Sequence, residues 1–258
     1  MSPAFRHGKN TAVYFDVTDF SPFLNAGTET AQVDTAETSA YGSTGKTFVT
    51  GLDAGTVSMA GMFSGIAGDI EPVLTAAIAS ATDNILTFAF DGGAPATNGN
   101  GRRCGLGAVQ QTSLVITAPI SGMVSLSFDA QLDGGADNGR LLWTPASTAV
   151  TGTGPIFYTT GEDLGTAQTN GAVAHLHVLS PNSLNQTITV KIQHSATAGG
   201  AYADLGTPMA FTTVGIGATS SQRITSVLTN IQQFVRAHIT LGGVATGAAL
   251  VVVSFAKR

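Results

Sequence analysis

Three histidines have the residue type and the spacing for metal binding. His175 and His177 are two residues apart, so on a strand both side chains point to one face, and His194 is placed to lie on a neighbouring strand. Three imidazoles can hold Zn²⁺. No Asp or Glu is close to His175 and His177, and no carboxylate motif follows them. We interpret them as ordinary histidines on the polar face of a strand, and we expect no metal and no cofactor.

The segment Ala40–Thr47 matches a phosphate-binding loop only at its end, where Gly45, Lys46 and Thr47 stand. That motif requires Gly at the position of Ala40, and it requires a following helix whose amide groups face the phosphates. The residues that follow, Phe48–Gly51, favour an extended chain. A Gly-rich loop is therefore predicted here rather than a nucleotide site.

The sequence contains no residue pattern typical of nucleophilic or acid–base catalysis. The Gly-x-Ser-x-Gly elbow is absent from the sequence. Cys104 follows Arg103, whose charge favours a thiolate, but a single Cys in a Gly-rich loop is typical of a residue without a catalytic role. Asp129 and Asp133 are two acids near the end of a strand, without a pattern that marks a catalytic pair. We predict that the protein is not an enzyme.

Composition indicates a β-rich protein. Only 10% of the 258 residues are charged, 43% are hydrophobic, and Gly contributes 32 residues. Long surface helices normally carry charged outer faces, whereas short strands joined by Gly-rich turns do not need them. One cysteine excludes an internal disulfide framework, and no apolar run approaches the roughly 20 residues that a membrane-spanning helix needs. No membrane association is expected.

Charge is unevenly distributed along the chain. Residues 1–150 hold 6 Lys and Arg against 13 Asp and Glu, a net charge of −7, and residues 151–258 hold 5 against 3, a net charge of +2. A nucleic-acid grip needs a basic patch, so the first half is not expected to bind DNA specifically.

Alternating apolar residues predict strands in both halves of the chain. In the first half they mark 11–17, 56–63 and 122–132, with further candidates at 85–90 and 113–117. In the second half they mark 187–193, 234–241 and 249–255. One helix is predicted at 69–80, with Asp69 as its N-cap and Pro72 in its first turn. The Gly-rich stretch 91–107 is expected to be a loop.

The first 145 residues resemble the major tail tube proteins of long-tailed, siphovirus-type bacteriophages. The residues that carry the resemblance are Arg6-His7-Gly8-Lys9, Ser21, Asp34-Thr35-Ala36-Glu37-Thr38, Gly42 with Lys46, Gly51-Leu52-Asp53-Ala54-Gly55-Thr56-Val57-Ser58, and Gly61-Met62-Phe63. Residues 156–258, with Lys191–Ser195 and Arg236-Ala237, look like β-rich C-terminal modules of other phage virion proteins.

The resemblance implies a mainly β fold: a tail-tube-type β-sandwich or barrel with one flanking helix (1–145), a linker (146–155) and a second β-sandwich domain (156–258). It implies a structural virion protein, made in the host cytoplasm, whose hexameric rings stack into the tail tube. The tape measure protein and the viral DNA would occupy the lumen without specific binding. The extra C-terminal domain would decorate the exterior, or would be a second tube-like domain, in which case trimeric rings would close the tube.

Inter-ring contacts are expected at two places in the chain. The tube family has a ring-stacking arm where this chain has the segment 40–51, and the N-terminus is the second expected contact. The expected contact residues are Arg6, His7, Lys9, Gly42, Gly45, Lys46, Phe48 and Val49. The alternative function is a carbohydrate- or surface-binding β-sandwich module, for which one Trp and 4 Tyr supply few aromatic platforms.

Overall fold

The computed structural model describes residues 11–39, 44–90, 102–144, 151–152, 154–180, 182–206, 209–226, 230–243 and 246–258. The chain forms two compact units: a larger one of Met1–Pro22, Ile85–Leu106 and Asp137–Arg258, and a smaller one of Phe23–Asn84 and Gly107–Ala136. Strands β6 (Arg103–Thr117) and β7 (Ser125–Trp143) contribute residues to both. This division differs from the contiguous domains 1–145 and 156–258, because N-terminal and C-terminal strands share a sheet.

The first sheet of the larger unit joins the two ends of the chain. Its pairing order is β13-β10-β15-β7-β6-β5-β1-β2. The remaining strands in that order are β1 (Ala12–Phe15), β2 (Thr18–Asp19), β5 (Asn84–Ala89), β10 (Ala172–Val178), β13 (Ser220–Ser226) and β15 (Val251–Lys257). Every residue of β10 is buried. Burial on both faces explains why the sequences of β10 and β15 are mostly apolar, because a strand that is covered on both sides has no face exposed to solvent.

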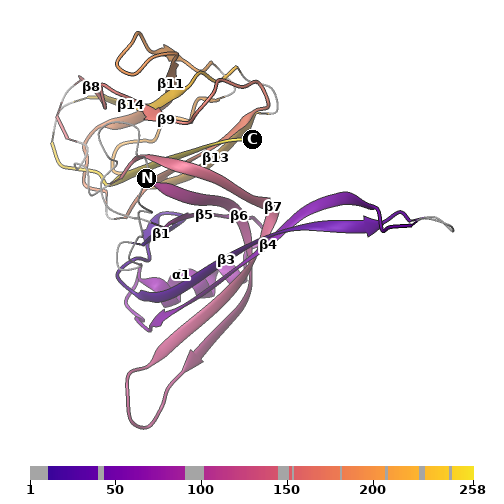
Figure 1. The fold of residues 1–258 in the computed structure, drawn as a ribbon. Coiled ribbons are helices and arrows are strands. Elements are labelled where there is room, and N and C mark those ends of the chain that lie inside the picture. The colour runs from indigo at the N-terminus through magenta and orange to yellow at the C-terminus, as the bar shows by residue number, and fades with distance from the viewer. Residues whose placement is uncertain are drawn as a thin grey trace, which may run out of the picture. The chain divides into compact units, whose positions relative to one another are not determined.

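The second sheet of the larger unit packs on the first through a common apolar core. Its strands are β8 (Gly154–Phe157), β9 (Glu162–Asp163), β11 (Thr187–Ser195), β12 (Ala203–Asp204) and β14 (Phe234–Gly242). The alternating residues Ile188, Val190 and Ile192 of β11 are buried in one cluster with Trp143 and Phe255 of the first sheet. The sandwich predicted for the C-terminal half is therefore confirmed (Figure 1).

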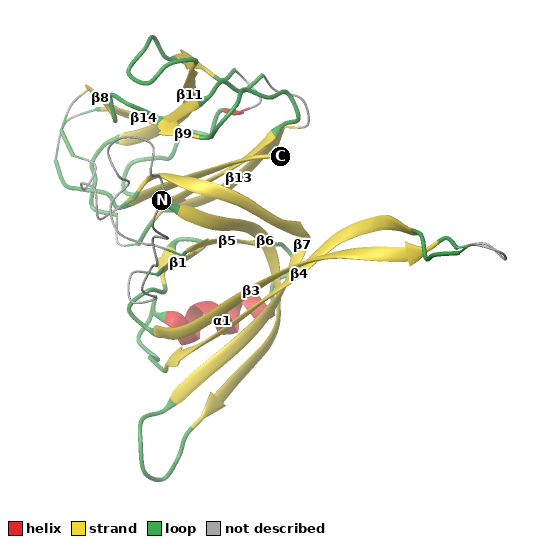
Figure 2. Cartoon of the chain, viewed as in Figure 1, coloured by secondary structure: helices red, strands yellow, loops and turns green. Residues whose placement is uncertain are grey.

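The smaller unit contains a long antiparallel hairpin, β3 (Leu24–Glu37) and β4 (Phe48–Met62). β4 also pairs with β7, from Thr56 opposite Gln131 to Met62 opposite Ser125. The predicted alternation is confirmed: Leu126, Phe128, Ala130 and Leu132 of β7 are buried. Figure 2 shows that helix α1 (Ile70–Ile78) is the helical element of this unit, among strands.

Helix α1 is slightly shorter than the predicted range 69–80, and its N-terminus differs from the prediction. Asp69 occupies the N-cap position, but its side chain makes no capping hydrogen bond. Its carboxylate instead accepts a hydrogen bond from the Ser64 hydroxyl. The apolar stripe is confirmed, since Ile70, Leu74 and Ala77 are buried. Within the residues that the structure describes, the mainly β class with one α-helix is confirmed.

The predicted loop at 91–107 is wrong at its C-terminal end. Residues 91–101 lie outside the described residues, but β6 begins at Arg103, and Cys104 is 1% exposed. Gly105 and Gly107 resemble loop residues in sequence yet belong to this strand. At Gly107 the reason is packing, because a Cβ there would lie 2.2 Å from Leu132 Cδ2. Most of the predicted linker, 146–155, also lies outside the described residues, and Gly154 and Pro155 belong to β8.

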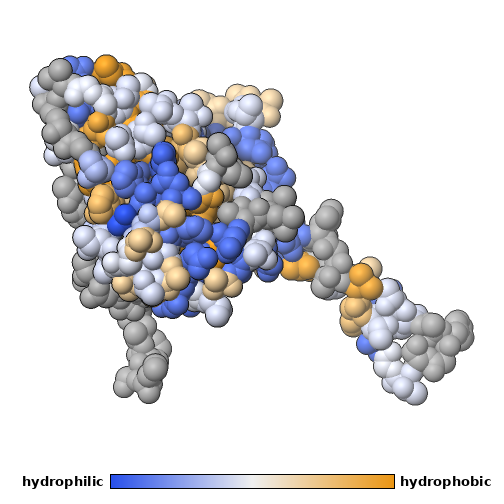
Figure 3. Space-filling view, turned by 90° about the horizontal axis from the view of Figure 1, so that it is seen from above, coloured by the Kyte–Doolittle hydropathy of each residue, from blue (hydrophilic) through white to orange (hydrophobic). Residues whose placement is uncertain are grey.

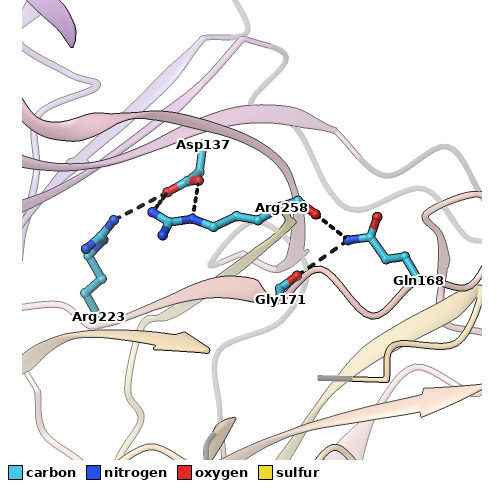
Figure 4. A network of polar contacts seen from close by, with 5 residues as sticks. All are labelled: Asp137, Gln168, Gly171, Arg223 and Arg258. Carbon is cyan, nitrogen blue, oxygen red and sulfur yellow. Dashed lines mark hydrogen bonds and ion pairs between the residues drawn. The ribbon is translucent and has the colours of Figure 1, made fainter. Parts of the chain in front are cut away.

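An ion-pair network holds the end of β15 in the larger unit (Figure 4). The Arg258 guanidinium donates from Nε to Asp137 Oδ1 (2.8 Å) and from Nη2 to Asp137 Oδ2 (2.9 Å). Arg223 Nη2 donates to Asp137 Oδ2 at 3.4 Å. Gln168 Nε2 donates to the carbonyls of Arg258 (3.0 Å) and Gly171 (3.4 Å). Two hydrogen bonds between one guanidinium and one carboxylate fix the orientation of both groups as well as their distance, so the network holds the C-terminal end of β15 in place.

Candidate functional site

The expected contact residues that the structure describes lie at one end of the β3–β4 hairpin. Gly45 and Lys46 precede β4, and Phe48 and Val49 are its first two residues. Gly42 lies outside the described residues, as do Arg6, His7 and Lys9. Four of the eight expected residues thus lie at this end of the hairpin, as neighbours in the chain.

Hydrogen bonds close the hairpin near this end. The amide of Thr38 donates to the Thr47 carbonyl (2.8 Å), and the amide of Thr47 donates to Ser39 Oγ (3.0 Å). Lys46 Nζ pairs with Glu37 Oε2 at 3.2 Å, with both side chains exposed. Exposed pairs of this kind contribute about 0–1 kcal/mol, so Lys46 can exchange Glu37 for another carboxylate at little cost.

Large apolar side chains are exposed on the same hairpin. Phe48 is 57% exposed, Val49 is 55% exposed and Val33 is 47% exposed. Figure 3 shows apolar residues in orange along the extended hairpin at its right. Scattered apolar residues are normal on a protein surface, but a group on one projecting element is typical of an interaction surface.

A second group of exposed apolar residues was missed from the sequence. Val115 and Ile116 lie at the end of β6, and Ile120 and Met123 lie in the connection to β7. All four are at least 45% exposed. The signal was present, because Val115 and Ile116 are adjacent and a half-buried strand alternates, so one of two adjacent apolar residues must face away from the core.

The outer edge of β3 is open. Among the residues that the structure describes, β3 pairs with β4 alone. Glu29 lies in this strand opposite the buried Val57, and burial raises its pKa to about 7. A long strand with one unpaired edge offers backbone N–H and C=O groups to another chain.

The histidine prediction is half confirmed. His175 and His177 do share one face of β10, but they are fully buried, so the polar-face interpretation is wrong. The reason is that neighbouring elements cover β10 on both faces. His194 lies in the other sheet, on β11, and does not join them.

Hydrogen bonds define how this buried pair is protonated. His177 Nδ1 lies 2.6 Å from the Asp16 carbonyl, which only accepts, so Nδ1 carries the proton. Its Nε2 then accepts from the Thr87 hydroxyl at 2.9 Å. Thr87 Oγ1 is also 3.2 Å from His175 Nδ1 and 3.3 Å from Ser254 Oγ. Burial lowers the pKa of His177 to about 4, and burial first, then His177, lowers that of His175 well below its ordinary value.

The remaining catalytic and metal candidates do not form sites. Cys104 is buried, which keeps its thiol from solvent. Asp129 accepts hydrogen bonds from Ser58 (2.6 Å) and Ser113 (2.7 Å), and these bonds lower its pKa. In the described part of the chain, no three His, Cys, Asp or Glu side chains are grouped as metal ligands would be. In the same part, no helix has the length and apolar character needed to span a bilayer.

In the described residues, the strand after Thr47 does not fit a phosphate loop, and the buried Trp143 does not fit an exposed sugar platform. Lys46 and Thr47 are followed by the strand β4, as predicted, and not by a helix. Trp143 is 3% exposed. The guanidinium carbon of Arg236 lies 4.1 Å from the ring centroid of Phe157 and 4.0 Å from that of Tyr202, so this arginine covers one face of each ring.

Comparison with known proteins yields structural likenesses alone. No protein-family model and no curated protein sequence matches the chain. A protein of the gene transfer agent virion is 13% identical, with a TM-score of 0.43 over 52% of this chain and 98% of that one. The SPP1 tail tube protein is 12% identical, with a TM-score of 0.41 over 51% and 77%. The SPP1 Dit protein is 10% identical, with a TM-score of 0.38 over 96% and 99%. Such values assign neither family nor function.

Proposed function

We propose that this chain is a structural protein of a phage tail, whose copies close into rings that stack into the tail tube. The single observation that carries the proposal is the β3–β4 hairpin, with an unpaired edge along β3 and exposed apolar side chains at its end. The resemblance of residues 1–145 to major tail tube proteins supports it.

The open edge of β3 supports lateral closure. A β-strand from a neighbouring copy would satisfy its unpaired backbone groups, and a closed ring would leave no free edge. Glu29 is already partly buried within one copy, which raises its pKa, so a hydrogen-bond donor from a neighbouring copy would stabilise its carboxylate. Six copies per ring are proposed from the resemblance, and three are the alternative if the larger unit also contributes to the tube wall.

The hairpin end supports stacking. Phe48 and Val49 would enter an apolar site on the next ring, and Lys46 would exchange Glu37 for a carboxylate there. Gly42 and Gly45, with Arg6, His7 and Lys9, complete the proposed inter-ring contact.

The lumen is proposed to hold the tape measure protein and then DNA, without specific binding. The net charge of −7 in residues 1–150 supports this, because a basic wall would retain DNA through counterion release. The proposed location is the virion tail, after synthesis in the host cytoplasm, and no catalytic step is involved.

Deletion of Gly42–Thr47 tests the stacking role. The variant is expected to retain the circular dichroism spectrum of the intact protein and to form rings that no longer stack, as seen by electron microscopy. Tubes of unchanged length would refute the role of the hairpin end. A deletion of Ala81 and Thr82, exposed residues in the turn after α1, is the control for shortening an exposed turn in the same unit.

A further inference from the structure

A pocket in the larger unit brings together three cations that strand pairing and one loop hold in place. It has a volume of about 510 Å³, within the range of roughly 300–1,000 Å³ typical of small-molecule sites. Arg103 of β6, Arg140 of β7 and Lys257 of β15 line it, together with Asp163. Asn138, Gly139, Leu164, Gly165 and Phe255 complete the lining.

The two arginines lie on paired strands and line the same pocket. β6 and β7 are paired here, since the Leu141 amide donates to the Arg102 carbonyl at 3.0 Å. Burial, and after it the charge of Arg103, lowers the pKa of Arg140. The ion pairs between described residues join Lys46 with Glu37, Lys191 with Asp204, and Asp137 with Arg223 and Arg258, so none of them includes Arg103 or Arg140. Two neighbouring guanidinium groups that repel each other are a ready partner for an oxyanion.

The one carboxylate that lines the pocket already has donors of its own. Asp163 Oδ1 accepts from the Gly165 amide at 2.8 Å, and both of its oxygens accept from Gln233 Nε2 at 3.2 Å. Glu162 is buried beside the pocket without lining it, and its charge acts on Arg140 in the opposite sense to that of Arg103. Three cations and one carboxylate thus line the pocket, and the charge of Asp163 acts on Arg140 and on Lys257.

The wall of the pocket is built before any ligand arrives. Lys257 Nζ donates to the carbonyls of Thr166 (2.8 Å) and Gly165 (3.5 Å), which ties the loop after β9 to β15. Gly165 has a φ of +78°, a conformation that favours glycine. A Cβ at Gly139 would lie 2.4 Å from the Phe255 carbonyl oxygen, so this position packs too closely for a side chain.

We infer that this pocket binds a small molecule carrying a doubly charged oxyanion, such as a phosphate ester, through the guanidinium groups of Arg103 and Arg140. Arginine donors match the geometry of phosphate oxygens in pairs. The remaining volume and the apolar Leu164 and Phe255 suit the organic part of an ester. Neither Arg103 nor Arg140 is among the proposed contact residues of the tube assembly, so this inference does not depend on that proposal.

Titration calorimetry of the full-length protein with glucose 6-phosphate and with inorganic phosphate tests the inference, with uncharged glucose as a control ligand. Both anions are expected to bind, more weakly as salt is raised, and glucose is expected not to bind. R103Q and R140Q are each expected to weaken binding by about tenfold or more, as loss of a charged hydrogen bond does. K46Q removes an exposed cation of the smaller unit and is expected to leave binding unchanged.

The inference would be overturned by no heat of binding for either anion with the intact protein, or by equal binding by R103Q. Arg103 is exposed, so R103Q remains informative even if R140Q, at a half-buried position, fails to fold. Equal weakening by K46Q would likewise overturn it, because that result indicates a general charge effect.

Discussion

Replacing Phe48 and Val49 together by Ser removes the exposed apolar end of the hairpin without touching the core. The two side chains are 57% and 55% exposed, so a neighbouring ring can bury at most about half of each. Full burial of such a side chain contributes roughly 1.5–3 kcal/mol, and half of that for each of the two gives about 1.5–3 kcal/mol for the pair. At about 1.4 kcal/mol per decade, the association constant for one stacking contact falls by about 10- to 150-fold.

Sedimentation velocity over a concentration series measures this effect as the concentration at which tubes form. The double variant is expected to need at least about 10-fold more protein than the intact chain, since each ring makes several such contacts. Ile216→Ser is the matched control, because Ile216 is 59% exposed and belongs to the larger unit, whereas the hairpin belongs to the smaller one. An unchanged threshold for the double variant, or an equal shift in the control, would refute the reasoning.

Three further changes probe the larger unit through urea unfolding. The pKa of His177 is about 4 in the folded protein and about 6.5 in the unfolded chain, so protonation favours the unfolded chain. The free energy of unfolding is therefore expected to be highest above pH 6.5 and to fall by about 3 kcal/mol as the pH is lowered towards 4. A urea midpoint that does not change between about pH 7.5 and 4.5 would contradict this. Asp137→Asn leaves Arg258 and Arg223 without their shared carboxylate, with an expected loss of about 1–3 kcal/mol in the free energy of unfolding; an unchanged midpoint would show that the network is not stabilising. In Gly139→Ala the new Cβ would lie 2.4 Å from the Phe255 carbonyl oxygen, so the free energy of unfolding is expected to fall by about 1–3 kcal/mol. In the control Gly45→Ala the new Cβ has no atom within 4 Å, and no change is expected. Equal urea midpoints for the two variants would refute the close packing at Gly139.

Local periodicity made most strands predictable. The alternation at Ile188, Val190 and Ile192, and that at Leu126, Phe128 and Ala130, each marked one buried face, and the structure buries these residues. The apolar stripe of α1 was predictable for the same reason. The division into units was not, because it depends on which distant strands pair: β1 with β5, and β15 with both β7 and β10.

The buried polar cluster shows where local reasoning fails. The spacing of His175 and His177 placed both side chains on one face of a strand. Their burial could not be predicted, because other elements of the fold cover that face. Their hydrogen-bond partner Thr87 lies 88 and 90 residues away in the sequence. The pocket around Arg103 and Arg140 was hidden for a similar reason, since its lining comes from β6, β7, β15 and the loop after β9. The hairpin end was accessible from sequence, because its residues are neighbours in the chain.

Electron microscopy of the purified 258-residue chain shows directly whether its copies assemble into a tube. We expect closed rings of six copies, or of three, that stack into hollow tubes as the protein concentration rises. A protein that remains monomeric at high concentration, with neither rings nor tubes under any condition, would contradict it.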